Sequence, residues 1–245
     1  MKKCSLRGGI AICFLLLGIF LTAEATEKID PEKIDPERFL GYVRNPPGRD
    51  SWASLKGTAQ HLRDNSRPVQ AKIEMGIFFT PVRTLAQIRF NGNEVYTIGQ
   101  SYGKDGATNV EKRITDGKKA QIGIYGITPE DLALSFLYWK FVKEEAPVTV
   151  RMEKCRVFRL ESKDRKEQVV VTISCQYLFP FKAEWYRKDS KEPVRKLEAA
   201  AFRKNNDYWF ITKINLSGKG WFTTIRFNDV NAGPFKQKLP EGLFQ

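Results

Sequence analysis

Side chains that commonly carry out catalysis are scarce in this chain. His61 is the single histidine among 245 residues, so a multi-histidine metal site cannot form, and a histidine-assisted nucleophile would have to use His61 itself. It lies beside Arg63 and Asp64 at the end of a predicted strand, where we expect a solvated surface histidine. The carboxylate pairs Glu130-Asp131 and Glu144-Glu145 are typical of helix capping and solvation. With no nucleotide-binding glycine motif, P-loop or HExxH sequence, we expect a protein that is not an enzyme and has neither a metal site nor another cofactor.

Two cysteines could form a disulfide bond. Cys155 and Cys175 flank the polar run 161–167, which predicts a turn between two strands. Pairing of these strands about Arg165 sets Cys155 opposite Cys175, which suits a disulfide at some ladder positions. Two buried, reduced thiols are the alternative, and we predict the disulfide.

The N-terminal residues have the features of a secretory signal peptide. Lys2, Lys3 and Arg7 precede an apolar run over residues 8–21, and Ala23-Glu24-Ala25 has the small-x-small spacing that a signal peptidase requires. The run is shorter than the roughly 20 residues of a membrane-spanning helix. We therefore predict a signal peptide over residues 1–25, cleaved after Ala25, and export to the periplasm.

The mature chain is strongly basic. Cleavage lowers the formal net charge from +13 to +11, which favours acidic partners such as phospholipid head groups or nucleic acid. Export argues against nucleic acid. Because the basic residues are spread along the predicted strands, a role in solubility alone is the alternative.

Hydrophobic periodicity predicts a mainly β protein. Asp35 and Pro36 begin a short helix that runs to about Val43, and an alternation of period two starts at Trp52. Its clearest stretch is an apolar face formed by Val69, Ala71, Ile73, Met75, Ile77 and Phe79. The predicted strands cover residues 52–62, 69–79, 83–90, 94–100, 110–115, 121–127, 148–160, 168–179, 182–187, 194–203, 208–216 and 221–229. Ten or more strands with short polar turns predict a strongly curved antiparallel sheet or a half-open β-barrel.

One segment departs from the β pattern. Thr128, Pro129 and Asp131 form a capped helix start, and residues 132–139 continue the helix. Its side chains are apolar nearly all round, so the helix must be buried on more than one side. It could cover the open side of the curved sheet or pack as ordinary core.

Large aromatic side chains are more numerous than a small barrel needs to fill its centre. They are Phe78, Phe79, Phe136, Trp139, Phe179, Phe181, Trp185, Trp209, Phe210, Trp221 and Phe222. A sheet curved around such rings can hold an apolar ligand. A well-filled core is equally compatible with this composition.

The order of the predicted strands and helix along the chain resembles that of a known protein family. The exported signal and the long strands precede the helix over residues 129–139, the Cys155 and Cys175 strands, Lys182-Ala183-Glu184-Trp185-Tyr186, Lys196-Leu197-Glu198 and Trp221-Phe222-Thr223-Thr224. This succession resembles the LolA-like outer-membrane lipoprotein-sorting family over most of the chain after Trp52. A Trp-x-Asp that relatives often carry after the second cysteine is replaced here by Gln176-Tyr177-Leu178.

The resemblance implies one β-barrel domain over residues 52–245, preceded by a linker and short helix over residues 26–51, with helices covering the open side. It implies a monomeric carrier, without a cofactor, whose apolar cavity shields the acyl chains of lipoproteins or phospholipids between an inner-membrane donor complex and an outer-membrane acceptor. The predicted cavity wall is Ile73, Met75, Ile77 and Phe79, and the predicted lid contacts are Phe136 and Trp139.

A second class of function is compatible with the same fold. A binding or regulatory module could sense a mislocalised lipoprotein or contact an envelope protein without transporting anything. Reversible loading with lipid would favour the carrier, whereas pairing with a membrane signalling protein would favour the module. An envelope hydrolase would need a nucleophile and a base that the sequence does not supply.

Overall fold

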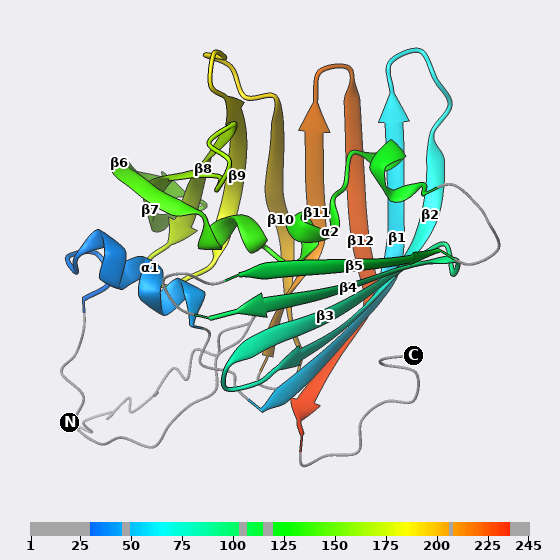
Figure 1. The fold of residues 1–245 in the computed structure, drawn as a ribbon, viewed down its shortest axis with the longest axis horizontal. Coiled ribbons are helices and arrows are strands. Elements are labelled where there is room, and N and C mark those ends of the chain that lie inside the picture. The colour runs from blue at the N-terminus through cyan, green and yellow to red at the C-terminus, as the bar shows by residue number, and fades with distance from the viewer. Residues whose placement is uncertain (1–29, 46–49, 103–106, 115–119, 206–207, 236–245) are drawn as a thin grey trace, which may run out of the picture.

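The computed structural model of the protein describes residues 30–45, 50–102, 107–114, 120–205 and 208–235. In this part of the chain, twelve antiparallel strands form one sheet in the order β5-β4-β3-β2-β1-β12-β11-β10-β9-β8-β7-β6 (Figure 1). The strands are β1 (Ser51–Arg63), β2 (Val69–Phe79), β3 (Arg83–Phe90), β4 (Glu94–Ser101), β5 (Thr108–Ile114), β6 (Lys140–Val150), β7 (Glu153–Glu161), β8 (Glu167–Ser174), β9 (Pro180–Arg187), β10 (Arg195–Asn205), β11 (Tyr208–Gly218) and β12 (Trp221–Pro234). The helices are α1 (Pro36–Arg44), α2 (Pro129–Leu132) and the 3-10 helices η1 (Ile122–Tyr125) and η2 (Ser135–Tyr138). The prediction of a mainly β protein is confirmed.

Two meanders make up the sheet. Strands β1 to β5 run outward on one side, strands β6 to β12 return on the other, and β1 pairs with β12 along its whole length. Among the described residues, β5 and β6 are the two edges and do not pair with each other, so the sheet is open and is not a closed barrel. Figure 1 shows β3 to β5 turned across the direction of β10 to β12, as expected of a strongly twisted sheet.

The alternating face of β2 is buried from Ala71 onward, whereas Val69 at the start of the strand is exposed. Ile73, Met75, Ile77 and Phe79 all belong to the hydrophobic core. The neighbouring strand β1 has a register shift beside Gly57, where an added Cβ would lie 1.9 Å from the carbonyl oxygen of Arg226. The close approach of β12 therefore requires glycine at this position.

Three predicted strands have a different structure. The strand predicted over residues 168–179 ends at Ser174, where a turn over residues 175–177 begins. The strand predicted over residues 121–127 is wrong, because residues 122–125 form η1 and Gly126 follows with a φ of 67°. Residues 148–160 are not one strand, because Arg151 and Met152 have φ of 55° and 66° and reverse the chain between β6 and β7. Such turns usually contain asparagine or glycine, and an Arg-Met pair gives no turn signal in the sequence.

The helix predicted over residues 129–139 begins as expected but is interrupted. The Thr128 hydroxyl accepts the Asp131 N–H at 3.2 Å, and the Asp131 carboxylate accepts the Thr128 N–H at 3.0 Å. After four residues α2 ends, and Leu134 has a φ of 55° before η2 begins. Leu132, Leu134 and Phe136 are all buried, and a straight helix would direct side chains two residues apart to different faces. Tertiary packing therefore divides the helix.

The helix α1 forms as predicted and belongs to the core of the sheet. The Asp35 carboxylate accepts the N–H groups of Glu37 and Arg38 at 2.9 and 3.1 Å. The fully buried ring of Phe39 stacks on Phe158 of β7 with 5.3 Å between ring centres. No helix within the described residues is long and apolar enough to cross a membrane.

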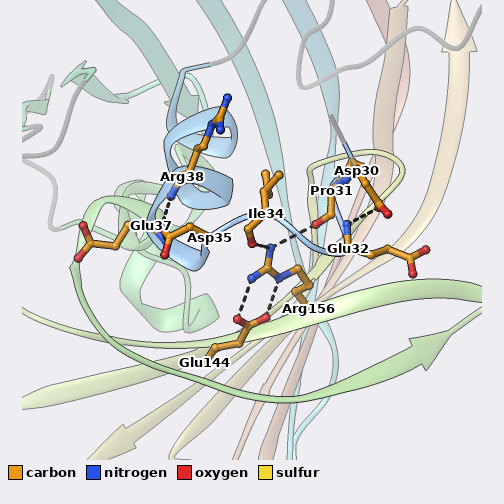
Figure 2. A network of polar contacts seen from close by, with 9 residues as sticks. All are labelled: Asp30, Pro31, Glu32, Ile34, Asp35, Glu37, Arg38, Glu144 and Arg156. Carbon is orange, nitrogen blue, oxygen red and sulfur yellow. Dashed lines mark hydrogen bonds and ion pairs between the residues drawn. The ribbon is translucent and has the colours of Figure 1, made fainter. Parts of the chain in front are cut away.

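Arg156 of β7 holds the N-terminal segment on the sheet (Figure 2). Its Nε and Nη2 donate to the two carboxylate oxygens of Glu144 on β6 at 2.6 and 2.7 Å. Its Nη1 donates to the carbonyl oxygens of Pro31 and Ile34 at 3.2 and 2.8 Å. The guanidinium also lies 4.8 Å from the ring centre of Phe39. One buried cation thus joins the chain before α1, α1 itself and the β6–β7 hairpin.

The predicted pairing of the two cysteines is wrong by one residue. In the β7–β8 ladder Cys155 lies opposite Ser174, the last residue of β8, and the Cys175 N–H donates to the Lys154 carbonyl at 2.9 Å. The hairpin is centred between Asp164 and Arg165 instead of on Arg165, and such a shift exchanges the faces of the side chains. Both thiols are buried and free in the structure. The disulfide between them stays a prediction.

Replacing Arg156 by methionine should destabilise the protein by about 3 kcal/mol, because the change leaves Glu144 without its buried partner. Urea unfolding measures this loss, and hydrogen exchange should accelerate most in residues 30–44. Arg159→Met is the matched control, since Arg159 is also on β7 and pairs with Glu145 at 2.7 Å but is more exposed. We expect the control to cost about 1 kcal/mol or less. Equal losses in the two variants would contradict the role given to Arg156.

Candidate functional site

Residues 120–139, here called the crossing segment, connect β5 to β6. Because these strands are the opposite edges of the sheet, the connection has to pass over one of its faces. In Figure 1 it runs from the region of β1 and β2 past β10 towards α1. Three groups of contacts hold it on the sheet.

The first contact is made by Glu94, a buried carboxylate at the start of β4. It accepts the backbone N–H groups of Gln121 and Ile122 and the hydroxyl of Tyr96, the last at 2.9 Å. Burial, together with the hydrogen bond to Glu94, raises the pKa of the Tyr96 hydroxyl, which therefore remains a donor. These hydrogen bonds satisfy the buried carboxylate and fix the start of η1.

His61 forms the second contact and is buried, so the prediction of a surface histidine is wrong. Its Nδ1 lies 2.8 Å from the Thr223 hydroxyl, which donates to the Tyr125 carbonyl at 2.6 Å. Its ring is 5.6 Å from that of Tyr125 and 6.1 Å from that of Trp221. The end of β1 is therefore covered by the crossing segment and by Trp221.

This hydrogen-bond chain fixes the tautomer of His61. The single Thr223 hydroxyl hydrogen goes to Tyr125, so Nδ1 must carry the imidazole hydrogen and donate to Thr223. The buried Nε2 has no hydrogen-bond partner among the described residues. Burial, with a smaller effect of Arg63, lowers the pKa of His61, and the residue is held neutral.

The third group of contacts joins α2 and η2 to the strands β9 and β10, and its second part joins η2 to α1. Arg195 of β10 donates to both carboxylate oxygens of Asp131 at 2.5 and 2.9 Å, and its guanidinium lies 4.1 Å from the ring centre of Trp185. The ring of Phe136 meets Trp185 edge-on at 5.1 Å. Trp185 of β9 thus contacts both the Arg195 guanidinium of the ion pair and the Phe136 ring of the crossing segment.

Arg44 connects the end of the crossing segment to α1. Its Nε and Nη2 donate to the carbonyl oxygens of Leu137 and Trp139, both at 2.7 Å, and the Tyr138 hydroxyl donates to the Arg44 carbonyl at 2.8 Å. Burial raises the pKa of the Tyr138 hydroxyl. These contacts are few and local, so the segment is attached at separate points along an apolar surface.

An aromatic pocket of about 230 Å³ opens near the other end of β9 and β10. We define it by its lining residues, Arg151, Glu153, Tyr177, Phe179, Phe181, Phe202 and Trp209. The pocket exists because β9 and β10 separate: they pair only between Lys182–Trp185 and Arg195–Glu198, whereas β10 continues to Asn205 beside β11. The Phe202 ring fills part of the gap and meets Phe179 and Phe181 at 6.0 and 5.5 Å.

The groups with possible redox or metal chemistry are not activated. Burial raises the pKa of the Cys155 thiol to about 11 and also raises that of Cys175, so both thiols are protonated near neutral pH. Within the described residues, no three histidine, cysteine, aspartate or glutamate side chains are placed to hold a metal ion.

Three solved structures from different bacteria are similar in fold to this chain. A DUF1329 family protein from Desulfovibrio piger has a TM-score of 0.63 at 14% identity, covering 79% of this chain and 90% of that one. A putative outer membrane lipoprotein-sorting protein domain from Vibrio parahaemolyticus has a TM-score of 0.59 at 13% identity, covering 77% of this chain and 87% of that one. A LolA superfamily protein from Nitrosomonas europaea has a TM-score of 0.57 at 10% identity, covering 86% of this chain and 98% of that one.

The chain has a LolA-like fold. No protein-family model and no curated protein matches the sequence. The resemblance inferred from the order of the sequence elements is thus confirmed at the level of the fold.

In this LolA-like fold the predicted wall and lid residues lie in one continuous core. Ile73, Met75, Ile77 and Phe79 are adjacent on β2 and buried, and Phe136 is buried against β9. Trp139, at the end of the crossing segment, is half-buried. The four β2 residues therefore share one buried face, and Phe136 packs over the other half of the sheet.

Several residues that hold the crossing segment or line the aromatic pocket were not identified from the sequence. They are Arg44, Glu94, Arg151, Tyr177, Arg195 and Phe202. Phe179, Phe181 and Trp209 were recognised as large aromatic residues, but nothing in their spacing places them in one pocket. Only Asp131 had a usable signal, because it forms a capping box with Thr128.

Stability should fall on mild acidification because of His61. The folded-state pKa of His61 is lowered, so unfolding takes up a proton below the ordinary value of 6.5. The stabilisation is complete above that pH and is lost as the pH falls towards the folded pKa, with a slope of at most about 1.4 kcal/mol per pH unit. Urea unfolding between pH 7.5 and 5.5 measures it. His61→Gln should remove most of the slope, and an unchanged slope in that variant would refute the assignment.

Asp131→Asn should cost about 3 kcal/mol of unfolding free energy, because the Arg195 guanidinium loses a buried, bidentate partner. Glu130→Gln is the matched control in the same helical turn and removes the same charge, for an expected loss of about 0.5 kcal/mol. Chemical unfolding compares the two variants. If their losses are similar, helix-end electrostatics and not the ion pair would explain the effect of Asp131.

Proposed function

We propose that the protein binds the acyl chains of lipoproteins or other lipids in the periplasm and carries them towards the outer membrane. The observation that carries this proposal is the arrangement of the apolar sheet face and the crossing segment, in a fold shared with a lipoprotein-sorting domain. The crossing segment is attached through Glu94, His61, Arg195 and Arg44, with apolar side chains between these points. It can therefore be displaced in parts without unfolding the sheet.

The proposed ligand replaces contacts between apolar side chains. In this proposal Ile73, Met75, Ile77 and Phe79 form the wall that meets the acyl chain, and Phe136 and Trp139 are the lid contacts that move to admit it. Each methylene group transferred from water contributes about 0.8 kcal/mol. A single acyl chain therefore binds appreciably but reversibly, as a carrier requires.

The proposal includes the cellular setting. The predicted signal peptide, residues 1–25, lies outside the described residues. An inner-membrane donor complex and an outer-membrane acceptor would be the partners, and the protein would act as a monomer without a cofactor. The mature chain, with a net charge of +11 after cleavage of residues 1–25, would favour contact with acidic head groups.

Native mass spectrometry of the protein purified from an envelope fraction, with lipid extraction of the same sample, tests the proposal. We expect a stoichiometric bound amphiphile. Ile77→Ala should lower its occupancy about tenfold, since the loss of a buried aliphatic contact weakens binding by one order of magnitude or more. Leu62→Ala is the control, because Leu62 is an exposed apolar residue. A protein that stays free of ligand after exposure to envelope lipids would favour a non-transporting binding module.

A further inference from the structure

The aromatic pocket is separate from the wall and lid residues of the proposed carrier site. Its base consists of the buried rings of Phe179 and Phe181, and its walls of the half-buried Tyr177, Phe202 and Trp209. Rings left partly in water gain free energy when an apolar group covers them. The lining therefore selects an apolar group.

The volume limits the size of that group. At about 230 Å³, the pocket is smaller than the roughly 300–1,000 Å³ of sites that enclose a whole drug-sized ligand. It can accept a single narrow chain and leave the remainder of a ligand at the rim. A ligand that matches it has one apolar tail and a head group outside.

The rim carries charges of both signs, since Arg151 and Glu153 both line the pocket, and Arg151 is the group that can bind a negatively charged head group. Arg151 lies 5.8 Å from the ring centre of Phe202 and pairs with Glu198 at 3.2 Å. Both side chains of this ion pair are substantially exposed, so the pair contributes little and can be exchanged for another anion. Lys204 is exposed and lies directly opposite Trp209 in the β10–β11 ladder, which places a second cation at the opposite wall.

The turn between β6 and β7 gives the rim its shape. Arg151 and Met152 both have the left-handed conformation, which is unfavourable for side chains of this kind. Met152 is 96% exposed and stands between the two rim residues Arg151 and Glu153. A flexible thioether at this point supplies apolar surface for the part of a tail that extends beyond the pocket.

We propose that the aromatic pocket binds the tail of a single-chain anionic amphiphile and that Arg151 binds its head group. Since the pocket shares no residue with the predicted wall and lid, this site does not depend on the proposed carrier function. Selectivity for the negative head group would come from Arg151, with Lys204 and the basic chain in support.

Fluorescence quenching by a brominated amphiphile tests the site. The probe is decanoate with bromine on its terminal carbon, used below its micelle concentration. Bromine quenches only nearby indole rings, and Trp209 is the tryptophan in the pocket. A probe bound at the proposed carrier site would quench Trp139 in every variant, so the signal of the pocket is the difference in quenching between the unmodified protein and Trp209→Phe, in which the other four of the five tryptophans remain. We expect this difference to be saturable. No difference between the two proteins would overturn the site.

Two further comparisons test the head group. Arg151→Gln should weaken binding of the probe about fivefold, as expected for a partly exposed ion pair. Arg165→Gln is the control and should leave binding of the probe unchanged. It removes the same charge from another arginine that has a positive φ in a hairpin turn. The cationic probe with the same brominated chain and a trimethylammonium head should bind more weakly than decanoate. Equal or tighter binding of the cation, or equal effects of the two substitutions, would refute the role of Arg151.

Discussion

The pairing of β1 with β12 is the interaction on which the rest of the structure depends. It joins the first and last strands of the sheet along the whole of β1 and makes one sheet of two meanders. Once β1 and β12 are central, β5 and β6 become distant edges. The connection between them must then pass over a face of the sheet, and it is this connection that carries the crossing segment. Gly57 is part of the same constraint, because only glycine permits the close approach of the Arg226 carbonyl.

Arginine side chains attach the irregular parts of the chain to this sheet. Arg156 binds two backbone carbonyls, a carboxylate and an aromatic ring. Arg195 combines a bidentate carboxylate with the face of Trp185, and Arg44 binds two carbonyls of the crossing segment. A planar guanidinium with several donors can satisfy these groups together and still stack on apolar surface. The segments are therefore held at defined points by polar contacts.

The two candidate sites differ because the sheet is continuous in one half and divided in the other. On β2 and its neighbours, side chains of one face pack into a single core. At the end of β10, loss of pairing with β9 leaves a gap that aromatic rings fill only in part. The first site can admit a ligand only by displacing the crossing segment. The aromatic pocket is already open, and in our proposal Arg151 at its rim determines its selectivity.

Local patterns determined much of the fold from the sequence alone. The alternation at Ile73 to Phe79 predicted β2, and the Asp35 cap predicted α1, because burial of one face and helix capping act between residues close in sequence. The order of the elements also pointed to the LolA-like fold. The buried residues of β2 could be named because a strand directs alternate side chains to one face.

Tertiary structure alone decided the features that depend on distant residues. The Arg151-Met152 turn and the bend at Leu134 carry no glycine or asparagine signal, and packing elsewhere imposes their left-handed conformations. His61 is buried because residues 122–126 and Trp221 cover it, and the cysteine register depended on the centre of a hairpin. The aromatic pocket arises where β9 and β10 separate. The sequence determined which faces are apolar, but which faces meet depended on long-range strand pairing that local periodicity does not encode.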